Sequence, residues 1–199
     1  METNRGRLAF LLIAIGAVGV IYLSFFTPTT YNLARAEEIA DNYRESLNRP
    51  DIAIDEIMEF EYNFYVVYYE KTTGIGAFEM LVDKETGRIF PEYGPNMMWN
   101  TKYGHGGMMG GSGGMMSGFT QLPSGGDVDE EEALQIAQGF LDEVYPGSEA
   151  DDPHPFYGYY TIHTTKDGEI TGMLSINTYD GAVWYHNWHG EYIQSLESH

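Results

Sequence analysis

The segment "MLVDKETGRIF", residues 80–90, aligns with "LSINTYDGAVW", residues 174–184, and this match decides the predicted fold. Gly87 falls on Gly181, 94 positions further along the chain. Each copy is typical of the end of one strand, a turn that contains the glycine, and the start of the next strand. A match of this kind predicts an internal duplication of one structural unit.

Helical patterns precede both copies, and "AEEIA" in the first falls on "ALQIA" in the second, 97 positions later. In the first copy, apolar residues recur at helical spacing after Asn32, which is placed to cap the helix, and "NRP" at residues 48–50 ends it. In the second copy, Asp127 or Asp129 is placed to cap the helix, and the acidic first turn suits the helix dipole. Each unit therefore begins with an amphipathic helix.

Runs rich in β-branched and aromatic residues follow each helix. We predict one strand over "IMEFEYNFYVVYYEK", residues 57–71, and a solvated, proline-flanked loop around Asp151 and Asp152. The predicted fold class is α+β, with two repeats of one helix packed on a small antiparallel β-meander, plus an N-terminal transmembrane helix. Because a unit of about 60–70 residues has a marginal core, we expect the two repeats to pack on each other.

Leu8 to Phe26 is a run of nineteen residues without a charge. A helix of that length spans roughly 28 Å, enough for the hydrocarbon core of a bilayer. Arg5 and Arg7 precede the run, and no Lys or Arg follows it before Arg35, so the N-terminus is expected in the cytoplasm and the bulk of the chain outside. The alternative is a cleaved signal peptide, whose apolar region is usually only about 7–15 residues long. We therefore predict a single-pass membrane anchor.

The chain is strongly acidic, with 10 Lys and Arg against 30 Asp and Glu, for a net charge of −20. Such a surface repels nucleic acid and anionic lipid headgroups. The chain has no cysteine, which excludes disulfides, zinc–thiolate sites and cysteine nucleophiles. The predicted organisation is a cytoplasmic tail (1–7), a transmembrane anchor (8–26), a first repeat (31–94), a Met/Gly/His-rich flexible linker (95–126) and a second repeat (127–194).

These motifs carry a family resemblance. A helix with "A-x-x-I-A", followed by strands ending in "V-D-x-x-T-G-x-I", resembles the PepSY domain. "AEEIADNY" and "FEMLVDKETGRIF" carry it in the first copy, and "ALQIAQGF" and "LSINTYDGAVW" carry a weaker version in the second. The resemblance implies a helix wrapped by a small antiparallel sheet, and a module outside the cell that binds partners or modulates a peptidase. The family has no established catalytic motif, so no site residue follows from the resemblance.

A glycine-rich stretch with paired methionines, "KYGHGGMMGGSGGMMSG" at residues 102–118, lies between the copies. Thioether and imidazole donors suit Cu(I) or Ag(I), and glycine lets a chain fold around an ion. The alternative is a plain flexible linker, for which Gly and Ser are the usual composition, although a linker does not need methionine. Both interpretations stay open, and in the copper interpretation the candidate ligands are Met97, Met98, His105, Met108, Met109, Met115 and Met116.

"WYHNWHG", residues 184–190, is a second candidate metal site because His186 and His189 are three residues apart. If a strand ends near His186, then His189 lies in the following turn and both rings can reach one ion. His154 and His163 of the same repeat are further candidates. Imidazole suits Cu(II), Zn(II) or Ni(II). The alternative is an aromatic edge whose histidines pack and hydrogen-bond without an ion.

The sequence contains no P-loop, dinucleotide fingerprint or H-E-x-x-H. We therefore predict a membrane-anchored, extracytoplasmic binding or regulatory protein that is not an enzyme and that acts on a peptidase or another membrane partner. The alternative function is copper binding or handling through the Met/His-rich loop.

Overall fold

The computed structural model describes residues 31–104 and 127–197. The chain from Tyr31 onward belongs to one compact unit. The predicted anchor, residues 8–26, lies outside the described residues, and within them no helix is both long and apolar enough to cross a bilayer. The anchor therefore stays a prediction from the sequence.

Helix α2 (Leu33–Ser46) begins where the sequence predicts, because the Asn32 side chain accepts a backbone hydrogen bond of 3.0 Å from the first turn. Its buried residues are Ala36 and Ala40. Since alanine is small, the helix lies close enough to the sheet for the Tyr68 hydroxyl to donate to the Ala40 carbonyl at 2.9 Å. The predicted helix and its cap are confirmed.

The strands β1 (Ile52–Phe60), β2 (Asn63–Glu70), β3 (Gly76–Asp83) and β4 (Ile89–Pro91) follow α2, and a single turn of helix, α3 (Pro95–Met98), ends this half. The second half contains α4 (Glu130–Val144), β5 (Glu149–Phe156), β6 (Tyr159–Lys166), β7 (Glu169–Asn177), β8 (Val183–Tyr185) and β9 (Tyr192–Glu197). Consecutive strands within β1–β4 and within β5–β8 pair antiparallel. Strand β9 returns to the first half and pairs antiparallel with β1.

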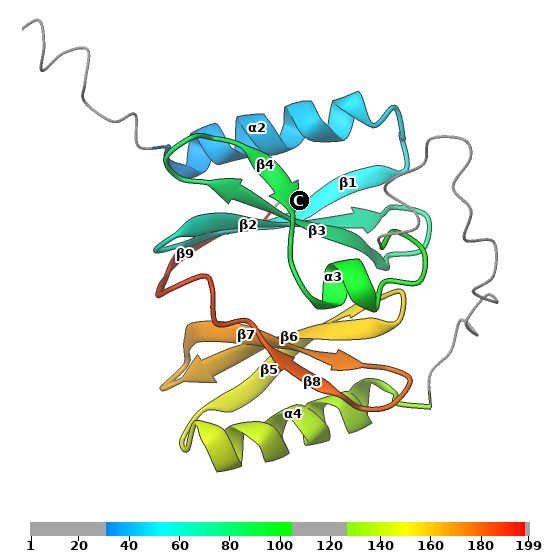
Figure 1. The fold of residues 1–199 in the computed structure, drawn as a ribbon, viewed down its shortest axis with the longest axis vertical. Helices are drawn as coiled ribbons and strands as arrows, with labels where there is room; N and C mark the ends of the chain where they lie inside the picture. The colour runs from blue at the N-terminus through cyan, green and yellow to red at the C-terminus, as the bar shows by residue number, and fades with distance from the viewer. Residues whose placement is uncertain (1–30, 105–126, 198–199) are drawn as a thin grey trace, which may run out of the picture. The chain divides into compact units, whose positions relative to one another are not determined.

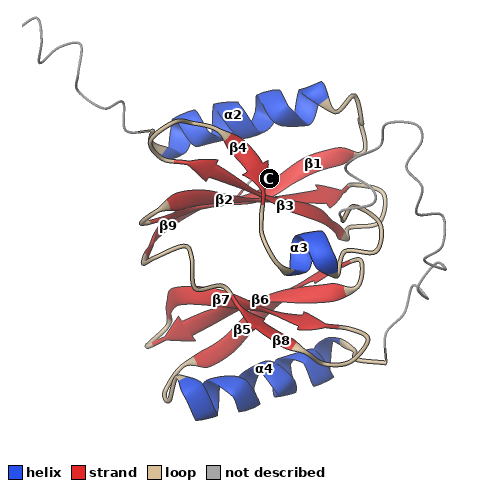
Figure 2. Ribbon diagram, viewed as in Figure 1, coloured by secondary structure: helices blue, strands red, loops and turns tan. Residues whose placement is uncertain are grey.

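Four layers follow one another, helix, sheet, sheet and helix (Figures 1 and 2). Helix α2 packs on β1–β3, and α4 packs on β5–β7. A third core lies between the sheets, with Tyr65 and Leu81 from the first half and Tyr159 and Met173 from the second. The two sheets also meet in one parallel pair between β3 and β5, which joins the strands into a nine-stranded mixed sheet. The α+β class is confirmed, but the sheet is larger than predicted and is not purely antiparallel.

Two predictions about strands are wrong. The segment over residues 57–71 is two strands rather than one, because the chain bends at Glu61 and Tyr62 between β1 and β2. Asp151 and Asp152 do not lie in a loop but in β5, where the register with β6 shifts between Asp151 and Pro153. Helix α3 and strand β9 are additions that the sequence patterns did not indicate.

The aligned glycines have the same backbone role in both halves. Gly87 and Gly181 have φ of +66° and +71°, a left-handed conformation that favours glycine. Their N–H groups donate to the carbonyls of Asp83 and Asn177 at 2.9 and 3.0 Å. The glycine therefore recurs at a spacing of 94 because each turn needs that conformation.

Candidate metal centre

A cluster of buried polar side chains lies between the two sheets. Glu92 follows β4, His186 follows β8, and His189 lies in the segment before β9. Their exposed fractions are 0%, 3% and 1%. One member comes from the first half and two from the second, so the cluster joins the halves. A carboxylate and two imidazoles buried this deeply require hydrogen-bond partners or an ion.

Glu92 and His186 occupy equivalent positions in the two halves, 94 residues apart. The N–H of Glu92 donates to the carbonyl of Glu79 at 3.0 Å, and the N–H of His186 donates to the carbonyl of Met173 at 3.0 Å. The same backbone geometry therefore fixes both side chains. Packing of the sheets face to face then brings the two equivalent positions together.

Both imidazoles approach the same oxygen of Glu92. Nε2 of His189 lies 2.9 Å from Oε1, and Nδ1 of His186 lies 3.1 Å from it. The contact with His186 lacks the geometry of a hydrogen bond. Nδ1 of His186 and the second oxygen of Glu92, Oε2, are therefore buried atoms without a hydrogen-bond partner among the described residues. Orphaned atoms at one point call for a specific explanation, and an ion bound there supplies one.

The outer nitrogen of His189 fixes the state of its ring. Nδ1 lies 2.8 Å from Oδ1 of Asn63, whose amide nitrogen donates to the carbonyl of Trp188 at 3.4 Å. Because an amide oxygen only accepts, Nδ1 of His189 carries the proton. In a neutral ring, Nε2 then presents a lone pair to the carboxylate of Glu92. Two electron-rich atoms 2.9 Å apart need a positive group between them.

A chain of hydroxyl groups places the proton of His186 on its outer ring nitrogen, as Asn63 does for His189. Thr161 donates to Oε1 of Glu79 at 2.7 Å, so its oxygen accepts from Ser175 at 3.2 Å. Ser175 in turn accepts from Nε2 of His186 at 2.9 Å. With Nε2 protonated, Nδ1 of the neutral ring carries a lone pair and lies 3.1 Å from Oε1 of Glu92, although it is not directed straight at that oxygen. Both histidines thus donate outward and place their inner nitrogens near one carboxylate, as metal-ligating histidines do.

Glu79 ends this chain as a second fully buried carboxylate. Besides Thr161, it accepts hydrogen bonds from the hydroxyls of Tyr65 at 2.5 Å and Tyr159 at 2.7 Å. Burial, and then the charge of Glu92, raise the pKa of Glu79 above its ordinary value. Three hydroxyl donors nevertheless need an acceptor, which favours the ionised form for the geometry seen.

The charge balance of the cluster requires positive charge. Burial raises the pKa of Glu92, but where the imidazoles are protonated, the charge and contact of His186 and then the contacts of His189 outweigh burial and hold this pKa low. In the part of the chain that the structure describes, no Lys or Arg forms an ion pair with Glu92 or Glu79. The ionised carboxylate of Glu92 is neutralised either by a proton on an imidazole or by a divalent cation, and a divalent cation also balances Glu79 when that group is ionised.

His154 and His163, predicted as further partners of His186 and His189, belong to a different cluster. His154 lies on β5 and His163 on β6, and they group with Glu56 of β1. The carboxylate of Asp55 raises the pKa of His154 to about 9, against the effect of burial. Burial, and then the charge of His154, lower the pKa of His163 to about 4.

The candidate copper ligands fall in two groups. Met97 and Met98 lie on α3, half-buried and exposed respectively. The other predicted ligands lie outside the described residues, and they are His105, Met108, Met109, Met115 and Met116. The copper site stays a prediction.

Glu92 is the candidate ligand that the sequence analysis missed. It stands 94 positions before His186, so the spacing that aligns the two glycines also aligns these two residues. That signal was available in the sequence. What the sequence did not indicate is that equivalent positions would face each other across the sheets.

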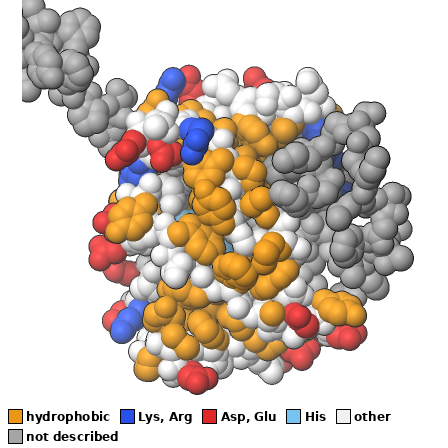
Figure 3. Space-filling view, in the orientation of Figure 1, with side chains coloured by type: hydrophobic (Ala, Val, Ile, Leu, Met, Phe, Trp, Pro, Cys, Tyr) orange, Lys and Arg blue, Asp and Glu red, His pale blue; other side chains and the backbone are white. Residues whose placement is uncertain are grey.

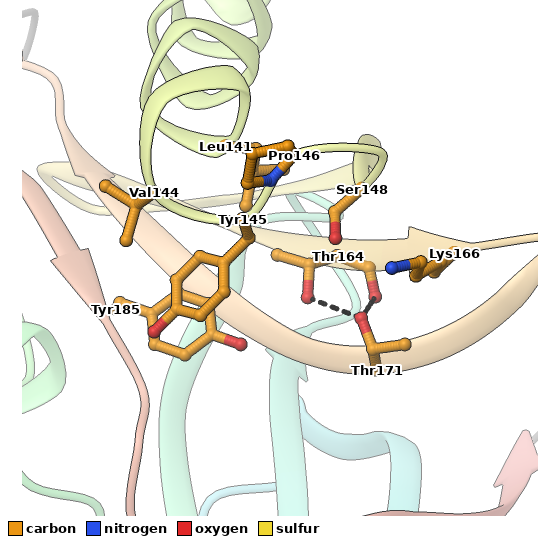
Figure 4. A pocket seen from close by; sticks show the side chains of 9 residues that line it. All are labelled: Leu141, Val144, Tyr145, Pro146, Ser148, Thr164, Lys166, Thr171 and Tyr185. Carbon is orange, nitrogen blue, oxygen red and sulfur yellow. Dashed lines mark hydrogen bonds between the residues drawn. The ribbon is translucent and has the colours of Figure 1, made fainter.

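An open pocket of about 400 Å³ lies elsewhere, between the end of α4 and the strands β6–β8 (Figure 4). The rings of Tyr145 and Tyr185 stack along one side with centroids 4.6 Å apart. Thr164 and Thr171 line the other side and bond to each other. Lys166 is its only charged lining residue, so the pocket offers no acid–base pair.

Comparison with known proteins gives little. No protein-family model matches the chain, and no curated protein matches it. A solved structure, the Bacillus megaterium YpeB C-terminal domain, is similar over 78% of this chain at 12% sequence identity, with a TM-score of 0.28. This chain spans 62% of the length of that structure. A likeness this slight carries no argument about fold or function.

Proposed function

We propose that this chain is a non-catalytic protein that holds a divalent first-row transition-metal ion between its two repeats, at Glu92, His186 and His189. One observation carries the proposal, the approach of two buried imidazole nitrogens to within 2.9 and 3.1 Å of one oxygen of a buried carboxylate. An ion at that point neutralises the buried negative charge and bonds to both halves of the chain. Its binding free energy is then folding free energy. The predicted anchor puts this centre outside the cytoplasm.

The donor set indicates the class of ion. Imidazole suits Zn, Cu, Fe and Ni, whereas Mg and Ca prefer oxygen. Two histidines with one carboxylate form the protein ligands of several zinc and non-haem iron sites. Here all three ligands are buried, so an ion among them is out of reach of a large substrate. That burial supports a structural or regulatory ion rather than a catalytic one.

The test begins with the full chain purified in detergent, unfolded in the presence of a chelator and refolded with or without Zn(II) or Co(II). We expect one tightly held equivalent that a chelating column does not remove. Co(II) in the centre is expected to give the visible bands of a nitrogen- and oxygen-ligated ion. At a free ion concentration of 100 times Kd, the folded state gains about 2.7 kcal/mol, which a thermal unfolding curve resolves.

Variants assign the ion to this centre. Glu92→Gln and His189→Asn are expected to lose the tightly held equivalent, while Glu85→Gln, an exposed glutamate in the turn before β4, keeps it. If Glu92→Gln fails to fold, the comparison of refolding with and without ion still decides. A chain that refolds in chelator to the same thermal midpoint as in Zn(II), with no Co(II) bands, would overturn the proposal.

Partner binding is a second candidate function, favoured by an exposed apolar face. Figure 3 shows hydrophobic side chains gathered over β4, α3 and β8. Tyr93, which lies between β4 and α3, and Met98 of α3 are exposed although both are large and apolar. Apolar patches of this kind mark contact surfaces. The partner predicted from the PepSY resemblance is a peptidase or another membrane protein, and Met98→Asp should weaken its co-purification with the full chain while leaving the fold intact.

Copper binding at the methionine-rich loop has its own test, titration of the full chain with Cu(I) against a competing chelator. Submicromolar binding that is lost when the methionines of residues 97–116 become leucine would support it. Micromolar or weaker binding, unchanged by those substitutions, would sink it.

A further inference from the structure

Glu56, His154 and His163 form a cluster where the first repeat meets the second. Each offers one donor atom, and these atoms all lie within 4.8 Å of one another. Glu56 comes from β1, and the two histidines come from β5 and β6. We propose that these three residues bind a second divalent transition-metal ion, which clasps β1 of the first repeat to β5 and β6 of the second. This site is separate from the buried centre and rests on different observations.

One pair of donor atoms stands near the spacing expected of two ligands of one metal ion. Nε2 of His163 lies 3.7 Å from Oε2 of Glu56, beyond hydrogen-bond distance. Nδ1 of His154 lies 3.5 Å from Oδ2 of Asp55, the neighbouring residue on β1. Donors placed about 2.1 Å from a tetrahedral ion stand about 3.4 Å apart. The Glu56–His163 pair is close to that spacing, and His154, whose donor atom lies within 4.8 Å of the other two, completes the set by a shift of its ring toward the ion.

The carboxylate of Asp152 lies beside the ring nitrogens of His154 and His163 that face away from β1. Its Oδ2 lies 3.1 Å from Nε2 of His154, with which it is hydrogen-bonded, and 3.6 Å from Nδ1 of His163. These are the ring nitrogens opposite to those that face Asp55 and Glu56. A carboxylate on the far nitrogen fixes the tautomer and orientation of a metal-ligating histidine. Asp152 thus holds the His154 ring with Nδ1 toward the first repeat, and its charge lies beside the far nitrogen of His163.

The backbone at Asp152 is strained in a way that serves this arrangement. Its φ is +50°, which is uncommon for a residue other than glycine, and it lies where the β5–β6 register shifts. The β1–β2 register also shifts, between Ile54 and Glu56. Irregularities in two strands thus aim carboxylates at the same pair of rings. Strain and bulges of this kind concentrate at functional sites.

This site differs from the buried centre in that part of it is exposed to solvent. The side chains of His163 and Glu56 are 8% and 10% exposed, but those of His154 and Asp152 are 25% and 65% exposed. An ion here can enter and leave without unfolding of the chain. Two imidazoles favour Zn(II), Ni(II) or Cu(II) over Mg(II) and Ca(II), and the surrounding carboxylates add charge attraction.

The experiment is Zn(II) binding to the full chain in detergent, measured with a competing chromophoric chelator that reports exchange rate as well as affinity. We expect one equivalent that exchanges rapidly, beside the slowly exchanging equivalent proposed for the buried centre. Mg(II) is expected not to compete. Absence of any rapidly exchanging equivalent in the wild-type chain would overturn the clasp, whatever the buried centre does.

Three variants locate the rapid equivalent. His163→Asn should weaken it at least about tenfold, and Asp152→Asn by about 10–100-fold through loss of ring orientation. Glu149→Gln, an exposed glutamate on the same strand β5, is the matched control and should leave it unchanged. If His163→Asn misfolds, Asp152→Asn alone decides, because its side chain is mostly exposed. Unchanged rapid binding in both variants would contradict the proposal. Retention of the slowly exchanging equivalent in both variants would show that the buried centre binds its ion independently of this site.

Discussion

Replacement of Glu70 by glutamine should remove a charge that stabilises the chain from neutral pH down to mildly acidic pH. Glu70 ends β2, and its carboxylate accepts from Lys102 at 2.5 Å and from the hydroxyl of Tyr157 at 2.6 Å. It also accepts from the hydroxyl of Tyr103 and from Thr73 at 3.1 Å. These donors come from three segments, and Tyr157 belongs to the second repeat. The carboxylate therefore ties the repeats and the segment after α3 together.

The magnitude follows from the pKa of Glu70. Burial alone would raise this pKa, but the bonds from Lys102, and then from Tyr103 and Tyr157, outweigh it and lower the pKa from 4.5 to about 2. A shift of that size corresponds to about 3 kcal/mol of stability. Because the Lys102 side chain is 44% exposed, its share is screened by solvent, and we expect about 2 kcal/mol. The folded-state pKa is depressed, so this contribution is complete above about pH 5 and is lost as the pH falls toward 2.

The assay is denaturant unfolding of the wild-type chain and of Glu70→Gln at a series of pH values. The difference in free energy of unfolding should be constant from pH 7 to about pH 5 and shrink below that. Glu143→Gln, an exposed glutamate on α4, is the control and should change stability by less than about 0.5 kcal/mol. A difference for Glu70→Gln that is equally small, or that does not change with pH, would refute the reasoning.

Two further predictions concern packing and topology. Gly76→Ala should destabilise the chain by about 1–3 kcal/mol in thermal unfolding, because the new methyl would lie 2.5 Å from the ring of Phe156, which stacks on Tyr159 at 4.8 Å. Gly139→Ala on α4, where a Cβ meets nothing within 4 Å, should instead stabilise it by up to about 1 kcal/mol; equal effects of the two would contradict the close packing at the β3–β5 contact. If residues 8–26 anchor the chain, a C-terminal reporter active only in the cytoplasm should stay silent, and activity would contradict the predicted orientation.

The sequence predicts those parts of the fold that local chemistry determines. Asn32 and Asp129 cap the two main helices because their side chains accept backbone N–H groups, and this is legible in the sequence. Strand β5 escaped prediction because it contains Pro153 and Pro155, which argue against a strand inside a sheet. Beyond its pairing with β6, β5 pairs with β3 at one residue pair, so most of its other edge needs no N–H donor. Proline is therefore tolerated there by tertiary context.

The candidate centre was half predictable for the same reason. The spacing of His186 and His189 after a strand is a local pattern, and the structure brings both rings to one point. The separation of His154 and His163 into another cluster depends on the bulge at Asp152 and on the approach of β1. Those are contacts between residues far apart in the sequence, and no local pattern encodes them.

Divergence between the repeats is what turns their interface into a binding site. Tyr65 and Tyr159 are equivalent positions, 94 residues apart, and both donate to Glu79. Two identical repeats packed face to face would place identical residues opposite each other. A glutamate at both position 92 and position 186 would therefore bring two buried negative charges together. His186 stands at that second position and supplies an imidazole in place of a second carboxylate. Duplication thus brought equivalent positions into contact, and the difference between them made the pair complementary toward a cation.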